Sequence, residues 1–197
     1  MIFPPSVNTD MGKNKRQQFE AVDRIHSRNI LVDSREELDM LAWLCEAVES
    51  GLVSDFEYQP DPIRLSGPVD FVNSQGKKRS LFREHIYTPD FIVKFKPGAF
   101  EQLDLWFKVP FDQMRQNEFK AYIDVKGGFM SNGSGRSFSI NQKWIYQLTG
   151  IYIQKVVPKD FFRKCGCPAA SFITRKTGKS RKMFQGYKSI KQTFGLS

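Results

Sequence analysis

The sequence predicts an α/β protein in which a central mixed β-sheet is flanked by helices. The first sign is an amphipathic segment at 34–51 that carries helix-capping residues at both ends. The second is a series of short, β-branched apolar runs, of which 86–95, 119–126 and 151–157 are the clearest. The third is a further helical segment, 140–148, between the last two of these runs. The order helix, strands, helix, strand is typical of a sheet with helices packed against it.

The composition is that of a globular chain. With 197 residues, 40% of them hydrophobic and 26% charged, the chain is long enough for one domain with a sizeable core and an appendage. It holds no apolar run near the roughly 20 residues that cross a bilayer, and its N-terminus lacks the pattern of a signal peptide, so we expect no membrane partner. Its three cysteines (Cys45, Cys165 and Cys167) are too few for a disulfide framework. They indicate a reducing compartment, which predicts a cytoplasmic protein.

Positive charge is concentrated at the C-terminus. Residues 159–197 hold ten Lys or Arg residues and one acidic residue, whereas residues 1–158 hold twenty of each sign. We therefore expect an N-terminal arm (1–29), a core (30–158) with an insertion at 96–118, and a basic C-terminal extension (159–197). Such an extension favours a polyanionic partner, of which nucleic acid is the commonest. The alternative is a solvated tail that aids solubility.

The first expected elements lie on either side of residue 34. A helical turn around Gln17–Ile25 and a short strand at 29–33 precede the clearest helix. Ser34 is a good N-cap for this helix, Glu37 completes a capping box, and Gly51 suits the position after its C-terminus. The apolar stripe that should face the core recurs at helical spacing and comprises Leu38, Leu41, Ala42, Cys45 and Val48.

The rest of the core should consist of short strands and one more helix. Gly150 should end that helix, and Pro158 should close the last strand. In chain order, we expect strands at 53–58, 62–65, 69–72 and 86–95, with a polar turn at 73–79, then a strand at 119–126, a Gly/Ser-rich loop at 127–137, a helix at 140–148 and a strand at 151–157.

The residues best suited to catalysis or metal binding lie at the ends of two predicted strands. Side chains alternate along a strand, so Asp124 and Lys126 point to the same side, and two glycines follow them. Asp90 begins another apolar run after Pro89. If the strands lie side by side, two carboxylates and an amine form a compact site for a divalent metal and a water. Each residue also has a simpler interpretation: Asp124 and Lys126 as a surface ion pair, Asp90 as a strand-end residue, and Glu37 as a helix cap.

These residues resemble the motif of the PD-(D/E)XK nuclease superfamily, which stands here as Pro89-Asp90 and Asp124-Val125-Lys126. The resemblance extends over residues 30–158 in the succession Ser34-Arg35-Glu36-Glu37, Phe56-Glu57-Tyr58-Gln59-Pro60, Tyr87-Thr88-Pro89-Asp90-Phe91 and Ile123-Asp124-Val125-Lys126-Gly127. The series is similar to small phage-encoded nucleases and, more loosely, to the phage junction-resolving endonuclease I. It implies a restriction-endonuclease-like core.

The resemblance also implies roles for individual residues. Asp90, Asp124 and the Val125 carbonyl would bind Mg²⁺, with Mn²⁺ able to substitute, because hard cations prefer oxygen ligands. Lys126 would orient or help deprotonate the attacking water and stabilise charge on the phosphoryl group. A helix-borne acid, Glu37 or its neighbour Glu36, would complete the catalytic set.

The implied activity is that of a metal-dependent endodeoxyribonuclease in phage DNA metabolism, acting in the cytoplasm of a bacterial host. The looser similarity points to branched or Holliday-junction DNA, and a homodimer would suit the two symmetric strands of a junction. Plain double-stranded or single-stranded DNA is the alternative substrate. A catalytically inactive DNA-binding accessory protein with a nuclease fold is the alternative function.

Basic residues outside this motif are candidates for nucleic-acid contacts. Lys143, on the helix after the glycine-rich loop, is an auxiliary candidate. The C-terminal candidates are interleaved with Met183, Phe184 and Tyr187, as suits phosphate contacts plus stacking. They are Arg175, Lys176, Lys179, Arg181 and Lys182.

Cys165 and Cys167 form a tight pair, but a structural zinc needs four ligands and no second pair stands at suitable spacing. We expect ordinary thiols, with a zinc site as the alternative.

Overall fold

Four strands form the central sheet, in the spatial order β10-β9-β8-β3. β3 (Val53–Tyr58) pairs antiparallel with β8 (Phe91–Phe95), β8 pairs antiparallel with β9 (Phe119–Val125), and β9 pairs parallel with β10 (Ile153–Val156). This is the mixed sheet that the sequence predicts, and the α/β class is confirmed. The structure is a computed structural model, and it describes residues 18–96, 98–99, 103, 119–128, 132–174 and 177–196.

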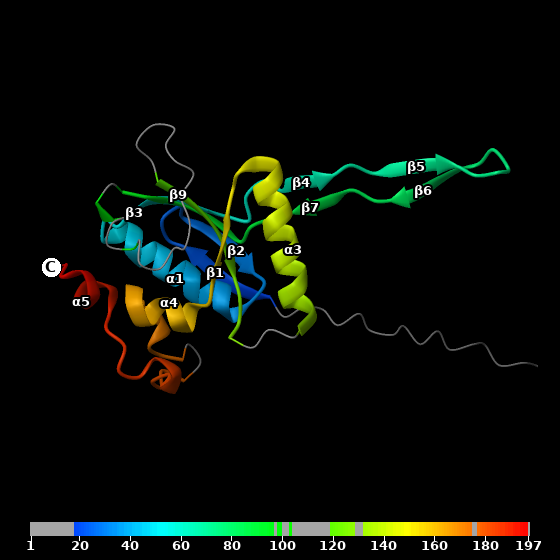
Figure 1. Cartoon of the computed structure of the whole chain (residues 1–197). Helices are drawn as coiled ribbons and strands as arrows, with labels where there is room; N and C mark the ends of the chain where they lie inside the picture. The colour runs from blue at the N-terminus through cyan, green and yellow to red at the C-terminus, as the bar shows by residue number, and fades with distance from the viewer. Residues whose placement is uncertain are drawn as a thin grey trace, which may run out of the picture.

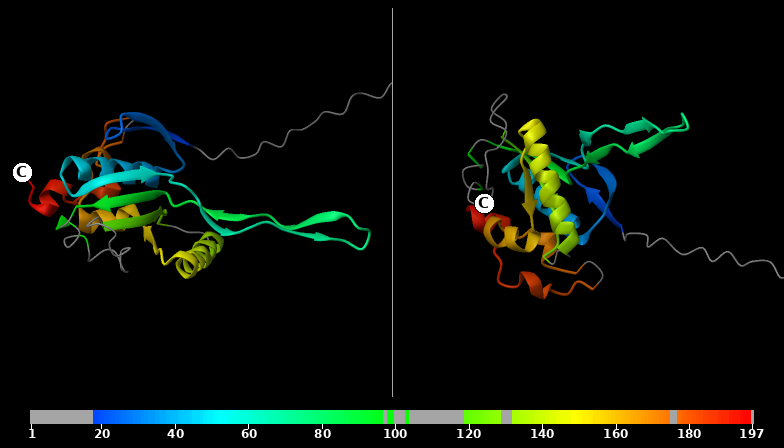
Figure 2. Two further views of the ribbon diagram at one scale, coloured as in Figure 1. Left: turned by 90° about the horizontal axis from the view of Figure 1, so that it is seen from above. Right: turned by 45° about the vertical axis from the view of Figure 1, so that its right-hand side comes forward.

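The two long helices cover opposite faces of this sheet (Figures 1 and 2). The main core lies between the sheet and α1 (Arg35–Glu49), where alternate residues of β8 and β9 are buried. A smaller core lies between the other face and α3 (Asn132–Thr149), and it includes Phe138, Ile145 and Ile153. Both faces of the sheet therefore contribute to a core.

The predicted caps of α1 are confirmed. Ser34 Oγ accepts a hydrogen bond from the Glu37 N–H at 3.1 Å, and Gly51 has a φ of +77°, which a side chain would disfavour. The predicted stripe is only partly right: Leu41 and Cys45 are buried, but Leu38, Ala42 and Val48 are half-buried. Trp43 and Leu44, which the sequence predicts to widen the stripe, are fully buried, and so are Met40 and Ala47, because the helix is covered from two sides.

The helical turn predicted near residues 17–25 is wrong. β1 (Phe19–Asp23) pairs antiparallel with β2 (Arg28–Val32), so the short predicted strand has a partner in the preceding segment. Ala21 and Asp23 are buried at alternate positions, which is the period of a strand. The hairpin packs against α1, so part of the expected N-terminal arm belongs to the main core.

A long two-stranded hairpin interrupts the sheet between β3 and β8. β4 (Ile63–Ser66) pairs with β7 (His85–Tyr87), and farther out β5 (Val69–Val72) pairs with β6 (Lys78–Phe82). The single strand predicted at 86–95 is thus two strands separated by Thr88-Pro89-Asp90. We call residues 63–87 the hairpin arm, because it projects well beyond the body of the molecule (Figure 1).

α3 begins eight residues earlier than the predicted helix at 140–148, within the predicted Gly/Ser loop. Glycine disfavours a helix by about 1 kcal/mol. Burial of Phe138 and Ile145 in the smaller core favours one, and tertiary packing decides the outcome. Gly150, with a φ of +73°, follows the helix as predicted.

The C-terminal segment is not an appended extension. α4 (Pro158–Cys165), two short 3₁₀ turns, η1 (Ala169–Ser171) and η2 (Lys182–Phe184), and α5 (Ile190–Phe194) all lie against the body. Phe161, Phe162, Phe184 and Ile190 belong to the main core. The predicted insertion at 96–118 lies almost entirely outside the described residues. In the part of the chain that the structure describes, no helix is both long and apolar enough to span a membrane.

Candidate metal centre

Asp90 and Asp124 lie opposite each other at one end of the sheet. β8 pairs with β9 in the register Phe91 to Ile123, and extending this register by one residue sets Asp90 against Asp124. Both residues alternate with neighbours that face α1, so their side chains belong to the α3 face. Asp90 Oδ2 accepts a hydrogen bond from the Val125 N–H at 2.6 Å, which ties the two strand ends together.

Lys126 is the basic residue of the site and pairs with Asp124. Its Nζ lies 2.7 Å from Asp124 Oδ2 and 5.9 Å from the centroid of the Phe138 ring on α3. Its backbone N–H donates to the Val156 carbonyl at 2.8 Å, which continues the parallel pairing with β10. The ammonium group is therefore fixed by a carboxylate, an aromatic face and its own strand.

Negative charge exceeds positive charge at this site. The pKa of Asp90 is raised to about 8 by burial and, to a smaller extent, by the charges of Asp124 and Glu37, against the opposing effects of Lys126 and the Val125 N–H. Asp124 is only 4% exposed and Glu37 only 6%. Two buried carboxylates and the half-buried Asp90 lie near one ammonium, an excess of negative charge that a divalent cation would neutralise.

Asp124 Oδ2 and the Tyr87 hydroxyl are both buried oxygen atoms at the site. Asp124 Oδ2 forms the ion pair with the Lys126 ammonium at 2.7 Å. The Tyr87 hydroxyl lies close enough to the acids that their charges, together with the larger effect of burial, raise its pKa. The hydroxyl therefore belongs to the same polar cluster as the two acids.

Tyr87 opens the Tyr87-Thr88-Pro89-Asp90-Phe91 segment of the resemblance, but the sequence predicts no role for its side chain. It stands three residues before Asp90, at the end of the hairpin arm, and its ring packs against the smaller core. Its hydroxyl stays protonated at neutral pH because burial and the two acids raise its pKa. It is therefore a hydrogen-bond donor for an anionic oxygen.

The structure places the two helix-borne acids differently. The Glu37 carboxylate accepts hydrogen bonds from Ser34 Oγ (2.7 Å), the Tyr58 hydroxyl (2.9 Å) and the Asp33 N–H (3.2 Å). Glu36 lies beside the turn after Lys126: a Cβ added to Gly127 would be 3.4 Å from Glu36 Oε1. Both residues thus remain candidates, Glu37 as a fixed buried charge and Glu36 as a freer carboxylate.

The backbone at Gln59, directly after β3, has an unusual conformation. Gln59 has a φ of +46°, uncommon for a residue other than glycine, and its N–H donates to the Asp90 carbonyl at 2.9 Å. Its side-chain amide donates to the Tyr58 hydroxyl at 3.1 Å. Gln59 therefore links the Asp90 backbone to the hydrogen-bond network of Glu37.

The donor set fits a magnesium-like cation. In the described ranges, no three His, Cys, Asp or Glu side chains are close enough to form a complete protein ligand set. Mg²⁺ commonly binds through one or two carboxylates and fills its other positions with water and substrate phosphate oxygens. Asp90 and Asp124 would be the ligands in such an arrangement, and a role for the Val125 carbonyl stays a prediction.

The predicted nucleic-acid contacts are dispersed. Lys143 is exposed on α3, and Lys179 and Lys182 are exposed in the C-terminal segment. Arg181 is instead bound to Asp39 through both carboxylate oxygens, at 2.5 and 2.8 Å. Arg175 and Lys176 lie outside the described residues.

The paired thiols are buried and free. Burial raises the pKa of Cys165 and of Cys167 to about 12. A metal binds the thiolate, which this environment disfavours, so the geometry supports the interpretation as ordinary thiols.

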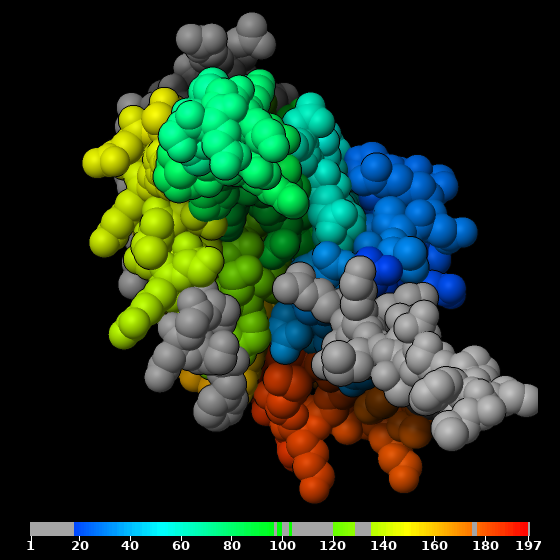
Figure 3. All heavy atoms as spheres, turned by 90° about the vertical axis from the view of Figure 1, so that its right-hand side faces the viewer, coloured from blue at the N-terminus to red at the C-terminus, as the bar shows by residue number. Residues whose placement is uncertain are grey.

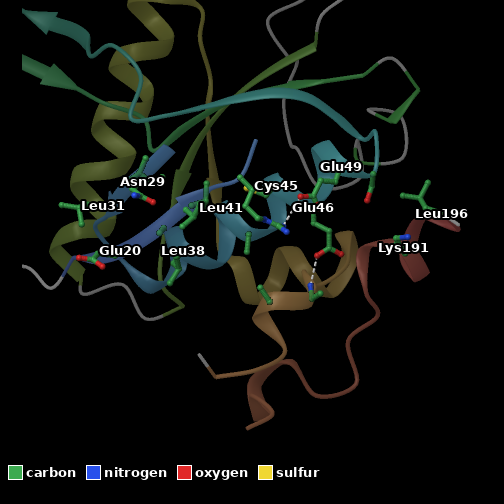
Figure 4. Close-up of a pocket in the computed structure, with 18 residues that line it drawn as sticks. Glu20, Asn29, Leu31, Leu38, Leu41, Cys45, Glu46, Glu49, Lys191 and Leu196 are labelled. Atoms are coloured by element: carbon green, nitrogen blue, oxygen red, sulfur yellow. Dashed lines mark hydrogen bonds and ion pairs between the residues drawn. The ribbon is translucent and has the colours of Figure 1, made fainter. Parts of the chain in front are cut away.

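A broad groove lies away from the acids. It is a groove of about 1390 Å³ between α1, the β1–β2 hairpin and the C-terminal segment, and none of the candidate site residues lines it (Figure 4). Its wall is mixed, with Leu38 and Leu41 beside Glu46 and Glu49, and Glu46 accepts the Ala169 N–H at 2.8 Å. The groove therefore bears no relation to the predicted chemistry.

Comparison of the chain with protein-family models, with curated proteins and with solved structures found no match. The function must therefore be argued from the site.

Proposed function

We propose that the protein is a metal-dependent endodeoxyribonuclease of the PD-(D/E)XK type, which hydrolyses phosphodiester bonds in DNA. The observation that carries the proposal is the meeting of Asp90, Asp124 and Lys126 at one strand end, with an excess of buried negative charge. A surface ion pair would not require a second acid beside it or the burial of Asp124.

The order of elements also supports the proposal. The elements of the body occur in the chain order α1, β3, β8, β9, α3 and β10, with the hairpin arm between β3 and β8. α1 bears the two helix-borne acids, β3, β8 and β9 pair antiparallel, and β10 pairs parallel with β9. The two motif acids stand on adjacent strands of this series, as the sequence resemblance implies. A ligand at this end of the sheet would contact β8, β9 and the start of α1.

Each residue of the site has a chemical task in this proposal. Asp90 and Asp124 would hold Mg²⁺ or Mn²⁺, which would supply Lewis-acid chemistry towards an anionic phosphoryl group and a bound water. The Lys126 ammonium, fixed by Asp124, orients the attacking water and stabilises negative charge on the phosphate. The Tyr87 hydroxyl donates a hydrogen bond into the same space.

Cleavage assays test the proposal directly. Labelled linear duplex, single-stranded and four-way-junction DNA are each incubated with the protein in Mg²⁺, Mn²⁺ or EDTA. We expect metal-dependent cleavage that leaves 5′-phosphate ends and falls at least a thousandfold in Asp124→Asn. Preference for the junction, together with a dimer in sedimentation, would identify a junction resolvase. Binding without cleavage in every condition would contradict the nuclease and support the accessory protein.

Stability measurements test the site without relying on activity. Because the Asp90 pKa is raised to about 8, its ionisation destabilises the fold progressively from about pH 4 to about pH 8. Asp90→Asn should therefore be more stable than the unchanged chain above pH 8 and equal to it below pH 4. Mg²⁺ should raise the unfolding midpoint of the unchanged chain more than that of Asp90→Asn. Equal shifts in both proteins would contradict a cation at Asp90.

A further inference from the structure

The hairpin arm exposes an unusual amount of apolar surface. Every residue of β5 and β6 is exposed, including Val72 at 68% and Phe82 at 60%. Isolated exposed apolar residues are ordinary, but here they share one projecting ribbon. The apolar residues exposed on the arm are Val69, Phe71, Val72, Leu81, Phe82 and Ile86.

Only the base of the arm is held by the body. Leu65 is buried in the smaller core, and the His85 ring meets Trp144 of α3 edge-on at 5.2 Å. Beyond these contacts, the strands pair only with each other, and a two-stranded ribbon alone is marginally stable in water. The outer arm therefore contributes little to the core, and its exposed side chains are available to a partner.

The arm carries basic residues whose positive charge favours an anionic partner. Lys77, Arg79 and Arg83 form no ion pair with any described residue, whereas Lys78 pairs with Asp70 at 2.9 Å. The neighbouring helix α3 contains no acidic residue and exposes Arg136 and Lys143. These like charges disfavour docking of the arm onto the α3 or the arm of a second copy.

The arm is also continuous with the candidate metal centre. β7 ends at Tyr87, and three residues later the chain reaches Asp90. The arm and α3 lie next to each other, as the view along the arm shows (Figure 3). A duplex placed with one phosphate at the acids would therefore extend alongside both basic elements. The major groove of DNA is wide enough for a two-stranded β-ribbon.

We propose that the hairpin arm is a duplex-DNA-binding ribbon that enters a groove of the DNA beside the cleaved bond. Lys77, Arg79 and Arg83 contact phosphates, and Phe71 and Phe82 contact sugars and base edges. The placement beside the cleaved bond rests on the proposed nuclease function, whereas duplex binding by the arm stands on its own charge and exposure.

Two arm variants test this inference. In the first, Gly67–Glu84 is replaced by an Asn-Gly turn that joins β4 directly to β7. In the second, Lys77, Arg79 and Arg83 are changed to Gln, which keeps the ribbon and its Lys78–Asp70 pair. The matched control changes three exposed lysines at the opposite end of the molecule to Gln: Lys159, Lys164 and Lys188.

Binding is measured by fluorescence anisotropy with a labelled duplex two helical turns long, in EDTA and over a series of NaCl concentrations. We expect both arm variants to weaken binding by about tenfold or more, and the triple Gln variant to reduce the slope of log K against log salt by about two to three. The control should change both quantities much less. Unaltered affinity and slope in both arm variants would overturn the inference.

Three further outcomes separate the inference from its alternatives. If the unchanged chain cleaves no DNA in any condition while the arm variants bind weakly, the nuclease proposal fails and the arm inference stands. If Asp124→Asn loses cleavage while the arm variants bind normally, the nuclease stands and the arm inference fails. If sedimentation shows a dimer that becomes monomeric on truncation with unchanged DNA binding, the arm's partner is a second copy, which also overturns the inference.

Discussion

The hairpin arm and the C-terminal segment (158–196) are both basic and aromatic in sequence, but the fold uses them in opposite ways. The C-terminal segment sends Phe161, Phe162 and Phe184 into the main core, where they are fully buried. The arm leaves Phe71 and Phe82 in solvent. The more basic of the two segments is thus largely structural, and the less basic one is free to bind.

The difference shows that net charge alone does not locate a binding surface. In the C-terminal segment, the Arg181 guanidinium is neutralised by Asp39 and stacked 4.6 Å from the Phe184 ring centroid. In the arm, three cations have no acidic partner among the described residues. A cation's availability to a polyanion depends on its partners, which only the folded chain defines.

The largest expected effect comes from truncating one phenylalanine in each region. Phe184 is fully buried and meets the rings of Phe162 and Tyr187, each at 5.6 Å. Phe184→Ala should therefore lower the free energy of unfolding by about 3–5 kcal/mol. Phe82→Ala on the exposed arm should change it by less than about 0.5 kcal/mol. Urea titrations of both variants measure these losses. Similar losses in the two variants would show that the two regions do not differ in their contribution to the core.

Removing one cation from each region should have the next largest effect. Arg181→Ala leaves the buried Asp39 carboxylate without its bidentate partner, and we expect a loss of about 3 kcal/mol. Lys78→Ala breaks an exposed pair with Asp70 and should cost less than about 1 kcal/mol. Chemical denaturation measures both losses. The hydrogen bond from Ser171 Oγ to Asp39, at 2.8 Å, is still present in Arg181→Ala. A stable Arg181→Ala protein would show that the segment is only loosely attached.

Two glycines provide a smaller and more local comparison. Gly166 has a φ of +81°, and an added Cβ would stand 2.6 Å from the Ile190 Cα, so Gly166→Ala should lose about 2–3 kcal/mol. Gly76, in the turn of the arm, has a φ of +73° with nothing near its added Cβ. Gly76→Ala should cost about 1 kcal/mol, from backbone strain alone. Thermal unfolding measures both variants. Equal unfolding midpoints would contradict close packing at Gly166.

Thiol chemistry gives the smallest effect at neutral pH. Because burial raises the pKa of Cys165 and Cys167 to about 12, their stabilising contribution is complete below the ordinary thiol pKa and is lost as pH rises towards 12. The loss amounts to about 1.4 kcal/mol per pH unit and thiol. At pH 8, a disulfide reagent should label these thiols slowly, whereas Ser80→Cys on the arm should react at once. Rapid labelling of the native cysteines would contradict their burial.

Local sequence signals predicted several features without any structure. The caps of α1, the strands at β3, β9 and β10, and the glycine after α3 follow from residues close in the chain. The two acids and the lysine of the candidate metal centre were also identifiable, because Pro89-Asp90 and Asp124-Val125-Lys126 stand at the ends of apolar runs. These features depend on local geometry, which the sequence encodes directly.

Tertiary contacts decided the rest. The sequence by itself determined the mixed α/β sheet and which acids stand at its strand ends, because strand periodicity and caps act over a few residues. Only the fold brought Tyr87 to Asp124, matched Arg181 with Asp39 across 142 positions, and left the outer strands of the hairpin arm, β5 and β6, exposed. Burial and pairing of this kind depend on segments distant in the chain, so no local pattern specifies them.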